Sequence, residues 1–207
     1  NSSAASDVYK RQPVGLLDLD LRAPNCHVVL GVGRLEPVEE KGIIAPEVDG
    51  IRFMSVYFYA GENPLPLRGR DVTNAMIELL TITRWEDTEY LIVDMPPGTG
   101  EEILDFVRLV GGKPVIITTP SKLTIDKNLR LLKLLRSLNV RDIGLVENRP
   151  HPHLEGTPAE LLKFGDVEFL GRLNYDPGLE ACIGDRDLLL RTKLASQLAE
   201  IAEGALR

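Results

Sequence analysis

The sequence predicts an α/β protein built on a doubly wound, mainly parallel β-sheet. Short apolar runs of strand length alternate along the chain with longer stretches in which apolar residues recur at helical spacing. Three of the short runs end in a polar residue, at Asp18, Asp94 and Asn148. Because the carboxyl ends of parallel strands share one edge of such a sheet, and ligands bind there, these residues predict one ligand site.

Residues 1–12 are expected to be a leader that is foreign to the protein. Residues 7–12 read DVYKRQ, which can be back-translated as GAT GTG TAT AAG AGA CAG. That sequence resembles the transposon-end adapter used in sequencing libraries, so the stretch is excluded from fold reasoning. We expect residues 13–207 to form a single domain that is incomplete at its N-terminus.

The part of the chain before residue 90 is expected to supply two strands and one helix. An apolar run at 14–18 predicts a strand that ends in Asp18, with Asp20 two residues later. Two acids at this spacing point the same way only if the chain is still extended there. The polar, turn-rich stretch 34–49 is expected to be a connection, 51–56 a strand, and 71–83 a helix.

The stretch YLIVDMPPGTGEE, residues 90–102, is the most informative part of the sequence. Its apolar run, 90–93, predicts a fully buried strand, which ends in Asp94 and is followed by a Pro-Pro-Gly-Thr-Gly loop. A carboxylate and a glycine-containing loop suit a magnesium–nucleotide site, because the acid holds the metal and backbone N–H groups face a phosphate. The plainer alternative, an aspartate that caps the next helix, does not account for the loop.

The second half continues the alternation of helices and strands. We expect helices at 101–110, 123–138, 158–164 and 192–206, and strands at 113–119, 142–147 and 167–173.

Composition excludes several classes of protein. The chain has 207 residues, a net charge of -7 and 43% hydrophobic residues, which is typical of a globular domain. The acidic balance argues against a nucleic-acid-binding surface. No apolar stretch approaches the length of a membrane span and no signal peptide is visible, so we expect a cytoplasmic protein that binds neither nucleic acid nor membrane. Cys26 and Cys182 are interpreted as small core residues.

Several motifs together resemble the MinD-like branch of P-loop ATPases, and within it the Mrp family of iron–sulfur cluster carriers. They are LLDLDLRAPN (16–25), RG (68–69), Trp85, YLIVDMPPGTGE (90–101), ITTPSKLTIDKN (117–128) and GLVEN (144–148). The resemblance covers nearly everything from Val14 onward, and the Pro-Pro-Gly-Thr-Gly loop is its most specific part.

The resemblance implies a catalytic role for three acids, with ATP and Mg²⁺ as cofactors. Asp94 would be the Walker B acid that holds Mg²⁺ through water. Asp20 would be the switch I acid that positions the attacking water or the metal shell, and Asp18 would support it.

The resemblance also implies contacts with the nucleotide. Gly98 would lie near the γ-phosphate, within a cofactor-binding loop that includes Pro97 and Thr99. Asn148 would hydrogen-bond the adenine edge, since its amide both donates and accepts, and Pro120 would border the base pocket.

Two family features are absent from the sequence. No glycine-rich GKGGVGKS-like loop with its lysine precedes Val14, so the first βα unit and the Walker A loop are expected to be missing, and this fragment is expected to bind ATP poorly and be inactive. The family's Cys-x-x-Cys, which holds a 4Fe-4S cluster between two subunits, is replaced at 149–153 by RPHPH. We interpret His151 and His153 as surface residues; the alternative interpretation is that they are cluster ligands.

Three functions remain open at this point. The first is a slowly hydrolysing, homodimeric ATPase of iron–sulfur cluster assembly, with apo iron–sulfur proteins as clients. The second is a MinD/ParA-like regulatory or positioning ATPase that carries no cluster. The third is a non-catalytic interaction protein on the same fold.

Overall fold

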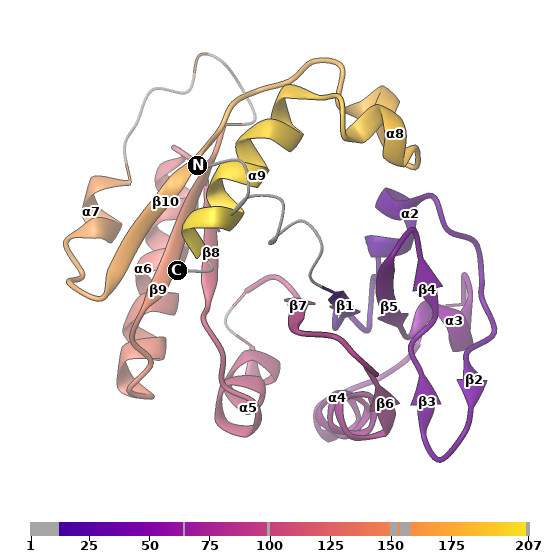
Figure 1. Ribbon diagram of the computed structural model, residues 1–207. Helices are drawn as coiled ribbons and strands as arrows, with labels where there is room; N and C mark the ends of the chain where they lie inside the picture. Colours follow the sequence, from indigo (N-terminus) through magenta and orange to yellow (C-terminus); the bar gives the residue numbers. More distant parts are fainter. Residues whose placement is uncertain (1–12, 64, 99, 150–152, 154–157, 206–207) are drawn as a thin grey trace. The chain divides into compact units, whose positions relative to one another are not determined.

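The computed structural model describes residues 13–205 except 64, 99, 150–152 and 154–157 (Figure 1). The chain divides into two compact units. Unit 1 comprises the described residues up to Asp105 together with Ile183–Asp185, and unit 2 comprises Phe106–Cys182 and the residues from Arg186 onward. The expectation of one domain over 13–207 stays a prediction.

Unit 1 contains a four-stranded sheet in the order β4-β5-β1-β7 (Figure 1). Its central strand β1 (Val14–Asp18) pairs in parallel with β5 (Ile51–Ser55) on one side and β7 (Tyr90–Asp94) on the other. The short β4 (Glu47–Val48) runs antiparallel to β5. Three of the four strands are therefore parallel, which agrees with the predicted α/β fold and its mainly parallel sheet.

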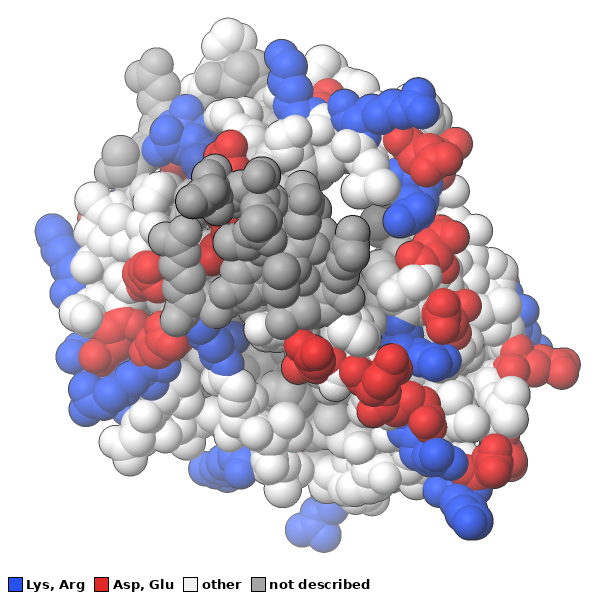
Figure 2. Space-filling model, in the orientation of Figure 1, with Lys and Arg blue, Asp and Glu red and all other residues white. Residues whose placement is uncertain are grey.

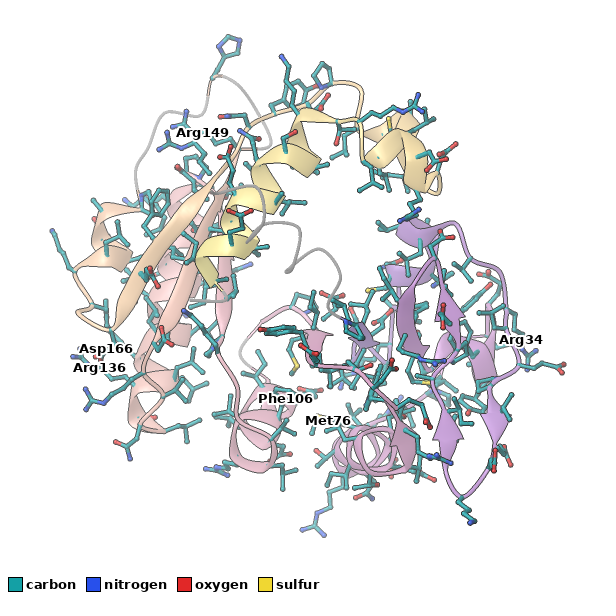
Figure 3. The ribbon with its side chains drawn as sticks, viewed as in Figure 1. Arg34, Met76, Phe106, Arg136, Arg149 and Asp166 are labelled. Carbon is teal, nitrogen blue, oxygen red and sulfur yellow. The ribbon has the colours of Figure 1, made fainter. Side chains whose placement is uncertain are left out.

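The helices of unit 1 are α2 (Cys26–Leu30), α3 (Tyr57–Ala60) and α4 (Arg70–Ile82). Figure 3 labels Met76 of α4, which is 2% exposed and belongs to the apolar core of this unit. Helix α5 (Glu101–Leu109) begins in unit 1 and ends in unit 2.

The stretch 34–49 is more ordered than predicted. It contains β2 (Val38–Glu39) and β3 (Ile43–Ile44), which form an antiparallel pair, and β3 also pairs with β6 (Thr83–Arg84). Together with β4, these are two-residue strands, too short to produce the alternation of apolar and polar residues by which a strand is recognised in a sequence.

Unit 2 contains a parallel sheet in the order β10-β9-β8. Its strands are β8 (Val115–Thr118), β9 (Ile143–Asn148) and β10 (Val167–Leu173). The central strand β9 is buried along almost its whole length.

Helices and a 3₁₀ turn complete unit 2. They are α6 (Lys122–Ser137), α7 (Ala159–Leu162), η1 (Glu180–Cys182), α8 (Arg186–Leu189) and α9 (Lys193–Ala205). Leu132 and Leu135 of α6 are buried in one apolar cluster with Leu145 of β9. The leucines at helical spacing thus face the sheet, as their spacing predicts.

Strand β7 is less buried than its sequence predicts. Leu91 is 38% exposed and Ile92 58% exposed. The reason is position, because β7 is the last strand of its sheet and has a strand neighbour on one side only among the described residues. Strand β8 is likewise the last of its sheet, with Val115 and Ile117 exposed.

A return of the chain to unit 1 brings two glycines together. Gly31 ends α2 with a φ of 65°, and a Cβ at this position would overlap the carbonyl oxygen of Gly184. The backbone N–H of Gly184 donates to the carbonyl oxygen of Val29 at 3.2 Å. Only glycine combines this φ with so close an approach.

Charged residues of both signs are interspersed on the face drawn in Figure 2. In unit 2, for example, Asp166 lies 3.6 Å from Arg136 and 3.4 Å from Arg141 (Figure 3). Among the described residues, no helix has both the length and the apolar character needed to cross a membrane.

We expect Leu145→Ala to destabilise the protein by roughly 2–5 kcal/mol, because it empties space in a packed core. Leu145 is fully buried, whereas Leu123 on α6 is 76% exposed. The matched variant Leu123→Ala is expected to change the free energy of unfolding by less than about 0.5 kcal/mol. Urea unfolding of both variants tests the assignment of the core, and equal effects would contradict it.

Candidate functional site

The candidate site lies at the carboxyl ends of β1 and β7. The two strands pair in register, so Asp18 is directly opposite Asp94, and the backbone N–H of Leu19 donates to the carbonyl oxygen of Asp94 at 2.9 Å. Parallel pairing therefore brings together two acids that are 76 residues apart in the sequence (94 − 18). The sequence prediction that both acids mark strand ends at one sheet edge agrees with this geometry.

Asp18 is fully buried, and its carboxylate organises the loop that follows β1. One oxygen, Oδ1, accepts the backbone N–H of Asp20 at 3.1 Å. The other, Oδ2, accepts the backbone N–H of Cys26 at 3.2 Å and the hydroxyl of Ser55 at 3.4 Å. Burial raises the pKa of the Asp18 carboxyl group, and the charge of Asp94 raises it further, against the lowering effect of the backbone hydrogen bonds.

Asp20 lies beyond the end of β1 and has a different role in the local structure. Its carboxylate accepts the backbone N–H of Ala23 at 3.2 Å, and its own carbonyl accepts the same N–H at 3.2 Å. The side chain thus closes a turn, a common use of aspartate. It remains half-buried, two residues from Asp18.

Cys26 is the residue that sequence reasoning missed. It is the first residue of α2, is half-buried, and its thiol donates to Oδ2 of Asp94 at 3.4 Å. Burial raises the pKa of the Cys26 thiol, and the charges of Asp18 and Asp94 raise it further. The interpretation of both cysteines as core residues is wrong, since neither is buried in the described structure.

The sequence indicates only indirectly that Cys26 lies near the two acids. The Arg-Ala-Pro-Asn stretch, residues 22–25, lies between the end of β1 and α2 and turns the chain back, so a helix starting at position 26 has its first residue beside the strand end. Proline and asparagine predict the turn, but they do not predict the direction in which the chain leaves it.

The loop after β7 is open around Gly98. This residue has a φ of 114°, a conformation that favours glycine, and no other atom lies within 4 Å of the position that a Cβ would occupy. Pro97 is exposed, and Thr99 lies outside the described residues. At the far end of the loop, Glu102 pairs with Arg22 at 3.0 Å, which ties α5 to the loop after β1.

The residues present fit a magnesium ion at Asp94. Its carboxylate is exposed at the strand end, so a hydrated ion can reach it, and carboxylate oxygen with water is the ligand set that Mg²⁺ prefers. Among the described residues, one group has potential ligand atoms within 4.8 Å of one another, and it consists of Asp18, Cys26 and Asp94.

The predicted base-binding residues belong to unit 2. Asn148 is the last residue of β9, and Pro120 follows the end of β8 by two residues. Because Thr118 of β8 pairs in register with Glu147 of β9, both lie near the carboxyl edge of that sheet. His151 lies outside the described residues, and His153 is exposed.

Two cavities in unit 1 lie away from the acids. The larger, of about 710 Å³, is lined by residues of the β2–β3 hairpin and α4. The smaller, of about 200 Å³, lies beside the loop after β1 and is lined by residues that include Arg22, His27 and Tyr57. Neither is lined by Asp18, Cys26 or Asp94, so the acids lie at an open strand edge and not in these cavities.

Comparison with solved structures shows the fold. A ParA family ATPase from Chlorobium tepidum TLS matches with a TM-score of 0.65 and 16% identity, over 99% of this chain and 88% of that one. The MinC:MinD cell division protein complex of Aquifex aeolicus matches with a TM-score of 0.63 and 17% identity, over 98% and 86%. These likenesses confirm the MinD-like P-loop NTPase fold.

Curated relatives are more similar in sequence. An iron–sulfur cluster carrier protein of Methanocaldococcus jannaschii is 31% identical over 85% of this chain and 66% of its own length. One of Pseudomonas fragi is 35% identical over 65% of this chain and 49% of its own. The cytosolic Fe-S cluster assembly factor CFD1 of Mycosarcoma maydis is 30% identical over 93% and 59%. The chain thus spans about half to two thirds of these relatives.

One family model, ParA, described as NUBPL iron-transfer P-loop NTPase, matches residues 4–203. The match begins within the stretch 1–12 that is expected to be foreign. Since it covers nearly all of the 207 residues, the chain belongs to this family of iron-transfer P-loop NTPases.

Proposed function

We propose that this chain is part of a homodimeric ATPase that binds Mg-ATP, hydrolyses it slowly and acts in iron–sulfur cluster assembly or delivery. The observation that carries the proposal is the pairing of Asp18 and Asp94 at adjacent strand ends, next to the open loop at Gly98. Phosphoryl transfer depends on positioning and charge neutralisation, and an acid beside an open glycine loop can provide both.

Asp18, Asp20 and Asp94 would have different roles at the site. Asp94, which is exposed, would hold the hydrated Mg²⁺, and the ion would neutralise charge on the phosphates when bound. Asp18 would act on the protein itself, because its carboxylate fixes the backbone N–H groups of Asp20 and Cys26. Asp20 would orient the attacking water or the metal shell from the turn that its side chain closes.

Further residues of the chain would contact the nucleotide. Gly98, with Pro97 and Thr99, would present the backbone of its loop to the γ-phosphate. Asn148 would donate to and accept from the adenine edge, since an amide offers both groups. Pro120 would form one wall of the base pocket.

The phosphate cradle would come from residues outside this sequence. The 207 residues contain no glycine-rich loop that ends in Gly-Lys-Ser or Gly-Lys-Thr. Such a loop supplies the backbone N–H groups and the lysine that hold the β- and γ-phosphates. We therefore expect this chain alone to bind ATP poorly, and the complete protein to bind it in the cytoplasm as a dimer.

The carriage of an iron–sulfur cluster is the part of the proposal for which an alternative has direct support in the sequence. Relatives that are named iron–sulfur cluster carrier proteins support the carriage of a cluster, which this chain would hold between two subunits and deliver to apo client proteins. The absence of cysteine from residues 149–153 favours instead a MinD/ParA-like regulatory ATPase, because thiolates are the usual ligands of such clusters. A non-catalytic interaction protein on this fold is the third candidate.

We expect Asp94→Asn in the complete protein to lower ATP turnover by roughly 100-fold, as does the loss of one charge-stabilising group elsewhere. The matched control is Asp87→Asn, an exposed aspartate just before the opposite end of β7, which should leave turnover unchanged. A coupled phosphate-release assay measures both. Unchanged turnover in Asp94→Asn would exclude the catalytic role proposed for Asp94, and no turnover in the unmodified protein would support the non-catalytic role.

Anaerobic incubation of the complete protein with iron and sulfide separates the two ATPase functions. The carrier function predicts a bound cluster, seen as broad visible absorbance that elutes with the protein. Protein that emerges colourless, while it still hydrolyses ATP, would exclude cluster carriage and leave the regulatory ATPase.

A further inference from the structure

Three potential metal ligands of different elements meet at the end of β1. Asp18 ends β1, Asp94 ends β7, and Cys26 begins α2. One ligand atom from each lies within 4.8 Å of both others. The three belong to unit 1, so their arrangement does not depend on unit 2.

Asp18 forms no salt bridge with any of the described residues. The described residues include one other fully buried carboxylate, Glu147, and it lies within salt-bridge distance of Arg149 and Arg172. Asp18 is equally buried, and the charge that acts on its carboxyl group is the like charge of Asp94, which raises its pKa. A buried carboxylate is costly unless a cation or a metal compensates it, so the burial of Asp18 opposite Asp94 favours the binding of a cation at this strand edge.

We propose that Asp18, Cys26 and Asp94 form a binding site for one divalent transition-metal ion of borderline softness, Fe²⁺ or Zn²⁺. Two positive charges would balance the two carboxylates that face each other across the β1–β7 pair. Binding would also require the Cys26 thiol to lose its proton to solvent, because thiolate is the form that coordinates metals.

The ligand set selects the kind of metal. A thiolate favours Zn²⁺, Fe²⁺ or Co²⁺ over Mg²⁺, which prefers oxygen ligands only. Three protein ligands leave one position of a tetrahedral ion for water or an incoming ligand. Asp94 is exposed, so the ion could enter and leave from solvent. This site goes beyond the proposed ATPase, since it needs neither nucleotide nor a glycine-rich loop.

Cobalt titration of the 207-residue chain, without nucleotide and under reducing conditions, tests the site. We expect one Co²⁺ per chain and a thiolate-to-cobalt charge-transfer band, which Zn²⁺ abolishes and an equal concentration of Mg²⁺ does not. Cys26→Ser should remove the band and weaken binding by about tenfold or more, the usual scale for losses at a metal site. Cys182→Ser, at the other free cysteine, is the matched control and should retain both.

Absence of the band in the unmodified chain, its survival in Cys26→Ser, or its loss in Cys182→Ser would overturn the proposal.

A second measurement avoids the risk that a variant fails to fold. In the unmodified chain, Zn²⁺ should slow alkylation of Cys26 by iodoacetamide but not that of Cys182, as read by mass spectrometry. Equal rates for Cys26 with and without Zn²⁺ would exclude the site, whatever the outcome of the ATPase assays.

Discussion

The in-register pairing of β1 with its two parallel neighbours is the constraint on which the candidate site depends. It sets Asp18 between Ser55 on β5 and Asp94 on β7, three polar residues at the ends of strands that are otherwise largely apolar. A slip of one residue would turn the side chains of β1 to the other face, so that Leu17 and Asp18 would exchange environments. The full burial of Leu17 thus helps to hold the acids opposite each other.

Backbone hydrogen bonds to Asp18 also fix the loop that follows β1. The Asp18 carboxylate accepts N–H groups from Asp20 and from Cys26, so one side chain fixes both ends of the loop that joins β1 to α2. The ion pair of Arg22 with Glu102 then links the middle of that loop to α5. Three segments around the candidate site are therefore held by interactions among themselves, which reduces the ordering that any ligand would have to impose.

The fold was predictable where packing follows local pattern. The run at 14–18 is the observed β1, and the leucines of 123–138 predict α6 to within one residue at each end. Prediction failed where the outcome depends on distant partners. Exposure of Ile92 reflects the edge position of β7, and Cys26 joins the acids only because the chain reverses after β1. Asp18 and Asp94 were predictable from strand ends alone, whereas the full burial of Asp18 depends on neighbours that are distant in the sequence, such as Ser55.

The contact between Gly31 and Gly184 has a consequence for dissecting the protein. The chain leaves unit 1 at residue 105, returns for residues 183–185, and leaves again, so three crossings join the two units. A single protease cut or a simple truncation near residue 105 would strip unit 1 of the segment that covers the end of α2. Isolated expression of unit 1 therefore calls for a redesigned chain, in which residues 183–185 are tethered back beside Gly31 by a short linker.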